Sequence, residues 1–398
     1  MRHLPTASPL VRWSAWLALA GLGGCVDAYM PEVVSANANY LVVDGFINGN
    51  GRTRIRLSRT ENIAATTAPL AEKGASLIIV DDAGQRYNLL ETSTAGSYLS
   101  DSLLLPAGRH YQLRITTAAK VVYASPLQAL NLTPPLDQLG WQPAGDQLTI
   151  SVSTHDATSK AQYYRWRYTE TWEFNAAFPS NLEFRDGIIQ SRITPIFTCW
   201  HTETPSAIQQ VSTAGLSQAV VANKVLLSPS AHSERFKIRY SVLVVQYAES
   251  AEEFAYNEVL RKNTEAVGTV NDPLPSQLTG NVHRLDNPQE PVLGFVGAHT
   301  VQTRRIFISR QDLPPRAPDF FENPYADCQA PDTAETVKPY NKNGVPYPKS
   351  MVFADPDNVP TDYTYGPSYG FPIMGYIGGA RECIDCRVRG SNMKPSFW

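Results

Sequence analysis

The chain has 398 residues, which at ~150 residues per domain allows two or three domains and excludes a single small module. Its net charge is -3 without a long run of one sign, which argues against nucleic acid as a partner. Charged residues make up only 18% of the chain, whereas thirty prolines and nineteen tyrosines favour strands and turns over long helices. We therefore expect an all-β protein.

The first 24 residues have the pattern of a lipoprotein signal peptide. A positively charged start, an apolar run from Trp13 to Ala20 and the small residues Leu22-Gly23-Gly24 precede Cys25. The alternative is a transmembrane anchor, but the apolar run is shorter than the ~20 residues that span a bilayer. We expect cleavage before Cys25, lipidation of its thiol, and a tether over residues 25–39.

Residues 40–134 have the alternation of a first β-sandwich. Ile55 and Leu57 alternate with arginines in residues 52–60, which predicts a strand with one face in solvent. About seven short strands recur at the ~8 to 12 residue spacing of an immunoglobulin-like or fibronectin-like sandwich. Thr133-Pro134-Pro135 breaks this pattern because proline cannot donate to a ladder, so we place the domain boundary there and expect residues 31–133 to fold alone.

Residues 135–312 are predicted to form a second sandwich of the same kind, with one short helix. Between Tyr163 and Phe174, aromatic residues alternate with arginine and threonine. Aromatic residues at strand spacing usually face a core, and the alternative is a platform on which sugars stack. Ser250 and Glu253 form a capping box before apolar residues at helical spacing, which predicts a helix over residues 250–263.

Residues 313–398 form a third region of different composition. Leu313 to Gly375 holds twelve prolines together with many tyrosines and aspartates. This stretch is too aromatic for a disordered linker and too rich in proline for a sheet. We expect an ordered, proline-rich meander that covers the second sandwich and ends in a Cys-x-x-Cys motif.

Four cysteines follow Cys25, namely Cys199, Cys328, Cys383 and Cys386. An even number in an oxidising compartment favours disulfides. Two alternatives are a redox dithiol at Cys383 and Cys386, and a zinc knuckle that adds Cys328 or Cys199 with His201. A meander short of sheet hydrogen bonds benefits most from a long closed loop, so we expect at least one bridge from Cys199 or Cys328 into the turn from Cys383 to Cys386.

The sequence lacks the usual catalytic motifs. It has no Gly-x-Ser-x-Gly elbow and no His-Glu-x-x-His pair. Asp355-Pro356-Asp357-Asn358 lacks the glycine and distal glutamate of a calcium loop and reads as a turn. Gly49-Asn50-Gly51 reads as a hairpin turn, since no helix follows it. We expect no enzymatic activity, metal or cofactor, with an undetected hydrolase as the alternative.

Several stretches together resemble a Bacteroidota lipoprotein family known only as domain of unknown function 4249. The resemblance covers nearly all of the mature chain and is most specific at its end. The stretches that carry it are Tyr40 to Gly45, Leu57 to Thr60, Tyr240 to Tyr247, Gly280 to Val282, Val292 to Phe295, Arg305 to Ile308, Cys383 to Arg387 and Lys394 to Trp398.

The resemblance implies a lipoprotein of the outer membrane, often encoded beside a TonB-dependent transporter. We therefore expect a non-enzymatic protein, lipid-anchored on the periplasmic face or the cell surface, that acts as a partner of such a transporter. The alternative is a surface protein that binds a glycan or peptide with Tyr and Trp side chains of the late meander. An exposed aromatic cleft of a few hundred Å3 would favour the ligand, and a flat apolar patch would favour the partner.

Overall fold

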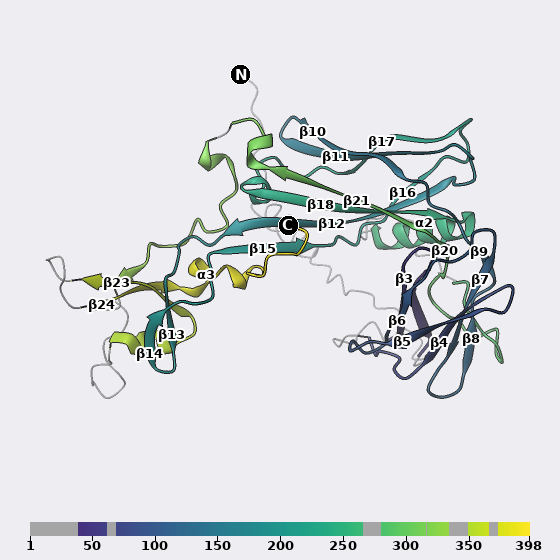
Figure 1. The fold of residues 1–398 in the computed structure, drawn as a ribbon, viewed down its shortest axis with the longest axis horizontal. Coiled ribbons are helices and arrows are strands. Elements are labelled where there is room, and N and C mark those ends of the chain that lie inside the picture. Colours follow the sequence, from purple (N-terminus) through teal and green to yellow (C-terminus); the bar gives the residue numbers. More distant parts are fainter. Residues whose placement is uncertain (1–38, 62–68, 266–279, 316, 334–348, 366–372) are drawn as a thin grey trace, which may run out of the picture. The chain divides into compact units, whose positions relative to one another are not determined.

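The computed structural model describes residues 39–61, 69–265, 280–315, 317–333, 349–365 and 373–398. These residues fold mainly as β-strands, so the all-β prediction is confirmed (Figure 1). The predicted signal peptide and Cys25 lie outside this part of the chain. None of the helices in the described ranges has the length and apolar character needed to cross a membrane.

The first sandwich is built from nine hydrogen-bonded strands. Its third strand alternates as predicted, because Ile55 and Leu57 are buried while Arg52, Arg54 and Arg56 are exposed. In spatial order the strands are β1 (Leu41–Gly45), β3 (Arg52–Arg59), β6 (Ser97–Ser102), β5 (Arg86–Glu91), β4 (Ser76–Asp81), β7 (His110–Thr116), β8 (Val122–Ala124) and β19 (His283–Arg284), with β9 (Gln128–Ala129) beside β7.

The core of the first sandwich is completed by a segment far along the chain. Val282, Val292, Val296 and Ala298 belong to the same buried cluster as the inward side chains of the early strands. The backbone continues this contact, since β2 (Ile47–Asn48) pairs in parallel with β20 (Ala298–His299). The predicted division ended the first domain at residue 134, and these contacts cross it. Apolar periodicity marks a residue as buried but does not tell which of two cores it enters.

The second sandwich consists of two facing sheets around one core, as predicted. Tyr164 and Trp166 are fully buried in that core, so these two rings are core residues and do not form a platform for sugars. One sheet contains β10 (Leu136–Ala144), β11 (Gln147–Asp156) and β17 (Ala219–Leu227); the other contains β15 (Thr198–Glu203), β12 (Tyr163–Asn175), β18 (Arg239–Glu249) and β21 (Val301–Ser309), with β16 (Gln209–Ser212) on β12.

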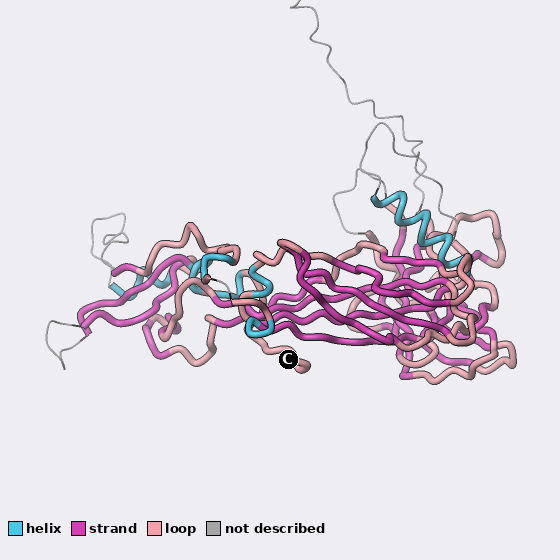
Figure 2. Tube along the Cα trace, turned by 90° about the horizontal axis from the view of Figure 1, so that it is seen from above, coloured by secondary structure: helices cyan, strands magenta, loops and turns pink. Residues whose placement is uncertain are grey.

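The predicted helix is α2 (Ala251–Glu265), which begins directly after β18. It is the long cyan helix at one end of the magenta strands in Figure 2. The helix contacts β12 and β18, and the ring of Phe254 lies 5.1 Å from that of Tyr163. α2 therefore covers the end of the second sandwich at which β18 finishes.

The third region contains a small sheet, contrary to the prediction that it is too rich in proline for one. β22 (Asp332–Thr333) and β23 (Asn358–Tyr365) flank β24 (Ile373–Ala380), while β13 (Leu182–Arg185) and β14 (Ile188–Ser191) form a separate hairpin. Pro360 is accommodated because the pairing register shifts directly after it, as at a β-bulge. A short helix, α3 (Arg381–Ile384), follows β24.

Two disulfides fasten this region. Cys199 of β15 is bonded to Cys386, and Cys328 is bonded to Cys383, with sequence separations of 187 and 55 residues. The prediction of a bridge into the turn from Cys383 to Cys386 is confirmed, and both turn cysteines take part. One bridge runs to the second sandwich and the other stays within the third region.

Candidate functional site

A pocket of about 720 Å3 lies where β1, β3, β12 and α2 meet the segment 293–295. It holds a mixture of side chains, with four arginines, two carboxylates and the rings of Phe46, Tyr256 and Phe295. Ligand pockets in proteins usually have volumes of ~300 to 1,000 Å3 and combine apolar walls with a few polar groups. The hollow therefore has the size and composition of a small-molecule site.

One face of helix α2 forms a wall of the pocket. Glu253, Tyr256, Asn257 and Leu260 line the pocket and fall at positions i, i+3, i+4 and i+7, which share one face of a helix. The helix is started by Ser250, whose Oγ accepts the N–H of Glu253 at 3.1 Å. This is half of the predicted capping box, because the carboxylate of Glu253 is directed at other partners.

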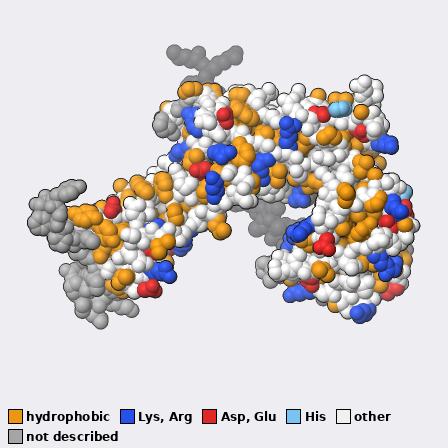
Figure 3. Space-filling view, viewed as in Figure 1, with side chains coloured by type: hydrophobic (Ala, Val, Ile, Leu, Met, Phe, Trp, Pro, Cys, Tyr) orange, Lys and Arg blue, Asp and Glu red, His pale blue; other side chains and the backbone are white. Residues whose placement is uncertain are grey.

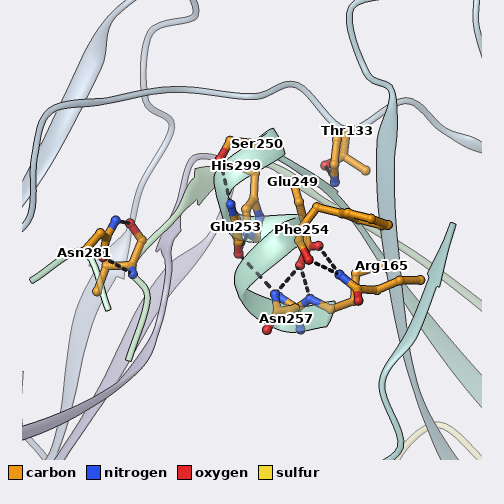
Figure 4. Close-up of polar contacts among 12 residues, drawn as sticks. Thr133, Arg165, Glu249, Ser250, Glu253, Phe254, Asn257, Asn281 and His299 are labelled. Atoms are coloured by element: carbon orange, nitrogen blue, oxygen red, sulfur yellow. Dashed lines mark hydrogen bonds and ion pairs between the residues drawn. The ribbon is translucent and has the colours of Figure 1, made fainter. Parts of the chain in front are cut away.

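Those partners form a buried cluster of charged groups at the start of α2 (Figure 4). The guanidinium of Arg165 donates through Nε to Glu249, and its Nη2 lies 3.6 Å from Oε1 of Glu253. Asn257 donates to Glu249 at 2.8 Å, and His299 Nε2 lies 3.4 Å from Glu253. The cluster joins β12, β18, α2 and β20, so it holds the helix wall in place.

Arg165 and the two carboxylates of this cluster have partners of opposite charge within it. Burial alone would lower the pKa of Arg165, but Glu249 and Glu253 outweigh it and the pKa is raised. Burial would raise the pKa of Glu253, but the charge and hydrogen bond of His299, together with Arg165, hold it below its ordinary value. Arg165 is thus a charged group whose partners are already present in the protein.

The other three arginines of the pocket are different. Arg54 and Arg56 project from the outer face of β3, and Arg167 is exposed on β12. Arg54 donates to Ser97 Oγ at 3.2 Å, and within the described residues no carboxylate lies within ion-pair distance of any of the three. Asp44, which faces Arg56 in the strand register, is the exposed acid of the pocket.

The pocket wall formed by residues 293–295 depends on close packing of backbone segments. Gly294 has a φ of +109°, and a Cβ on it would lie 1.8 Å from the carbonyl oxygen of Val43. A Cβ on Gly280 would lie 1.9 Å from the carbonyl oxygen of Gly294. Asn281 then exchanges two hydrogen bonds with the backbone of Val296, at 2.8 and 3.0 Å. Three of the stretches that carry the family resemblance therefore meet here.

The cysteines and the two turns singled out from the sequence do not line this pocket. All four cysteines after Cys25 are in disulfides, which leaves no thiolate among them for redox or zinc chemistry. Asp355 accepts the N–H of Asp357 at 3.0 Å in a plain turn, and Asn50 occupies the hairpin turn before β3. In the part of the chain that the structure describes, no cluster of three or more His, Cys, Asp or Glu could hold a metal ion.

Among the described residues of the late meander, three tyrosine rings pack on one another. The Tyr363 ring lies 6.2 Å from Tyr365 and 5.8 Å from Tyr376. A second hollow, of about 530 Å3, is lined by Phe178 and Tyr325 among others, so an aromatic cleft does occur near this region. The sequence did not identify the pocket arginines as a site, because they come from two strands far apart in the chain.

Comparison with solved structures finds two fibronectin type III domains from chicken tenascin at 12% identity, covering 51% of this chain and 88% of that one, with a TM-score of 0.16. A DUF4785 family protein from Legionella pneumophila matches at 12% identity, covering 52% of this chain and 51% of that one, with a TM-score of 0.18. Scores this low carry no argument about fold or function. Among curated proteins nothing matches.

One family model matches residues 26–305, more than half of the chain, and its description is "Domain of unknown function (DUF4249)". The match includes the strands, the helix and the segment 293–295 that form the pocket. The chain therefore belongs to the DUF4249 family.

Proposed function

We propose that this chain is a non-enzymatic binding protein that holds a small ligand in the pocket between β3, β12 and α2. The observation that carries the proposal is the pocket itself, about 720 Å3 in volume and lined by rings, arginines and one face of a helix. A cleft lined by aromatic rings was expected of a ligand-binding protein, and a flat apolar patch of a transporter partner. A cleft of this size therefore supports ligand binding.

The environment of the acidic groups supports binding over catalysis. Glu253 is nearly fully buried and is engaged by Arg165 and His299. A general acid or base must reach the reacting atom within hydrogen-bond distance. The arginines and rings that face the pocket can bind and orient a ligand, and Asp44, the exposed acid, lies opposite Arg56 in the strand register.

The two disulfides support a location outside the cytoplasm. Disulfides persist in oxidising compartments such as the periplasm or the cell surface. Together with the lipoprotein pattern that ends at Cys25, this supports a protein anchored by lipid to the outer membrane.

A second candidate function is that of a partner of a TonB-dependent transporter. Ile193 and Met393 are 77% and 78% exposed, and their segments are joined by a hydrogen bond of 2.9 Å from Asn392 to the carbonyl of Pro195. Neighbouring exposed apolar side chains favour a protein contact. If this surface binds the transporter, Ile193→Asp with Met393→Asp should abolish co-purification of the transporter from native membranes. Unchanged recovery of the transporter would exclude this surface as the binding site.

The proposed binding function can be tested with protein purified from the cells that naturally produce it. Native mass spectrometry of the washed wild-type protein should detect a stoichiometric small-molecule adduct. Leu260→Trp should lose the adduct because the indole fills the pocket, whereas Ala255→Trp should keep it because Ala255 is on the exposed side of the same helix. An adduct-free wild-type protein that also takes up nothing from a cell extract would overturn the proposal.

A further inference from the structure

We infer that the pocket selects an organic anion with at least two acidic groups, bound by Arg54, Arg56 and Arg167. This inference rests on the proposed binding function and specifies its ligand class. It concerns small carboxylate- or phosphate-bearing molecules, because both groups accept bidentate hydrogen bonds from a guanidinium.

The charge of the pocket opposes that of the chain. Four arginines and two carboxylates line it, which gives +4 and -2, a local charge of +2. The whole chain carries -3. Figure 3 shows Lys and Arg side chains on both sides of a hollow next to these strands. An anion entering such a concave site meets a favourable potential.

The partners of the arginines show which of them can bind a ligand. Arg165 is held by Glu249 and Glu253, so its charge is satisfied inside the protein. Arg54, Arg56 and Arg167 have no such partner among the described residues. Holding three like charges around one hollow is unfavourable without a ligand, and a bound anion would remove that repulsion.

The strand geometry sets the spacing of the acidic groups. Arg54 and Arg56 are two residues apart on β3 and point to the same side, which separates their Cα atoms by ~7 Å. Arg54 is oriented by its hydrogen bond to Ser97. Acidic groups several ångströms apart on one molecule would therefore contact both arginines, while Arg167 approaches from the second sandwich.

The aromatic rings of the pocket favour a ligand with an apolar organic framework. Phe46, Tyr256 and Phe295 line the same pocket, and flat apolar groups stack on rings or arginine planes. Inorganic anions would gain only the arginine contacts. We therefore expect inorganic phosphate to bind more weakly than an aromatic polyacid of comparable charge.

The test uses isothermal titration calorimetry of the folded, oxidised protein with benzene-1,3,5-tricarboxylate, the uncharged benzene-1,3,5-tricarboxamide, and inorganic pyrophosphate. The tricarboxylate should bind one to one, at least ~10-fold more tightly than the tricarboxamide. Raising NaCl from about 50 to about 500 mM should weaken it ~10-fold or more. Arg54→Gln with Arg56→Gln should weaken it ~10-fold, whereas Arg52→Gln, on the same face of β3 but outside the pocket, should not.

The outcomes separate this inference from the binding function. Equal binding of acid and amide, no binding of the acid, or no effect of the double substitution would overturn the anion inference. A native adduct that Leu260→Trp removes would still support the pocket in that case. If pyrophosphate binds more tightly than the tricarboxylate, a phosphate-bearing ligand is indicated and the role of the rings is refuted.

Discussion

The pocket end and the carboxyl-terminal end of the molecule are held together by different means. Around the pocket, β2 pairs with β20 and a buried cluster of Arg165, Glu249, Glu253 and His299 links the elements, without a disulfide. At the other end, the bonds from Cys199 to Cys386 and from Cys328 to Cys383 fasten a region of short strands and turns.

The difference follows from what each region can bury. The first sandwich has a large apolar core, so ordinary packing and pairing suffice to hold it. In the third region, Val359 and Ile384 pack against Ile196 of the second region in a small buried cluster. A region with little apolar surface to bury gains most from covalent cross-links, whereas a binding site needs polar groups arranged without them.

The largest effect should come from removing the distant segment of the first core. A fragment of residues 40–133 lacks Val282, Val292 and Val296, whose burial contributes ~5 to 9 kcal/mol, comparable to the stability of a whole domain. We expect no cooperative thermal transition in this fragment by circular dichroism. The chain of residues 40–398, which keeps these valines, should unfold cooperatively. Cooperative unfolding of the short fragment would support the predicted boundary at residue 134.

Removing the disulfides should have the next largest effect. In the chain-entropy model, Cys199→Ser with Cys386→Ser loses about 5 kcal/mol, and Cys328→Ser with Cys383→Ser loses about 4 kcal/mol. Urea unfolding followed by tryptophan fluorescence measures both losses. Ligand affinity at the pocket should be unchanged in the second pair of substitutions. Losses below ~1 kcal/mol would mean that packing alone secures the third region.

Breaking the buried charge cluster should lower the free energy of unfolding somewhat less than removing a disulfide does. Arg165→Met leaves Glu249 without its cation and Glu253 with His299 alone, and removing one partner of a buried pair costs ~3 kcal/mol or more. Arg167→Met, two residues along the same strand but exposed, should change stability by less than ~0.5 kcal/mol. Adding Glu249→Gln to Arg165→Met should recover part of the loss. Equal effects at Arg165 and Arg167 would contradict the assigned roles.

The smallest predicted effect depends on pH and concerns Asp385, between the two turn cysteines. Burial would raise the pKa of Asp385, but hydrogen bonds from Arg387 and the charges of Arg387 and Arg381 outweigh it and lower the pKa. A lowered folded pKa gives stability that is present above the unfolded value and lost as the pH falls through the folded value. Asp385→Asn should therefore cost ~2 kcal/mol at pH 7 and less at pH 3, by urea unfolding. A cost that does not shrink in acid would contradict the ionic role.

The sequence was a good guide to local structure and a poor one to the site. Alternation at Ile55 and Leu57, and helical spacing after Ser250, depend on neighbours in the chain and were predicted correctly. The disulfides were partly predictable because only four cysteines had to be paired. Pro360 was misjudged because a bulge can place a proline in a sheet, which composition does not reveal.

The pocket could not be predicted because its walls come from distant parts of the chain. Arg56 and Arg167 are more than a hundred residues apart, and nothing local to either indicates a shared hollow. The same holds for Gly294, whose need for glycine comes from the carbonyl of Val43. Such convergence is a property of the packed fold, and each residue alone reads as an ordinary surface or turn position.

The most direct measurement is a crystal structure of the protein with the ligand it carries from its own cells. We predict density for an acidic organic molecule in contact with Arg54, Arg56 and Arg167, next to the ring of Tyr256. Ligand density in the hollow lined by Phe178 and Tyr325 would contradict the assignment of the site. So would a ligand in the pocket whose acidic groups do not touch the three arginines.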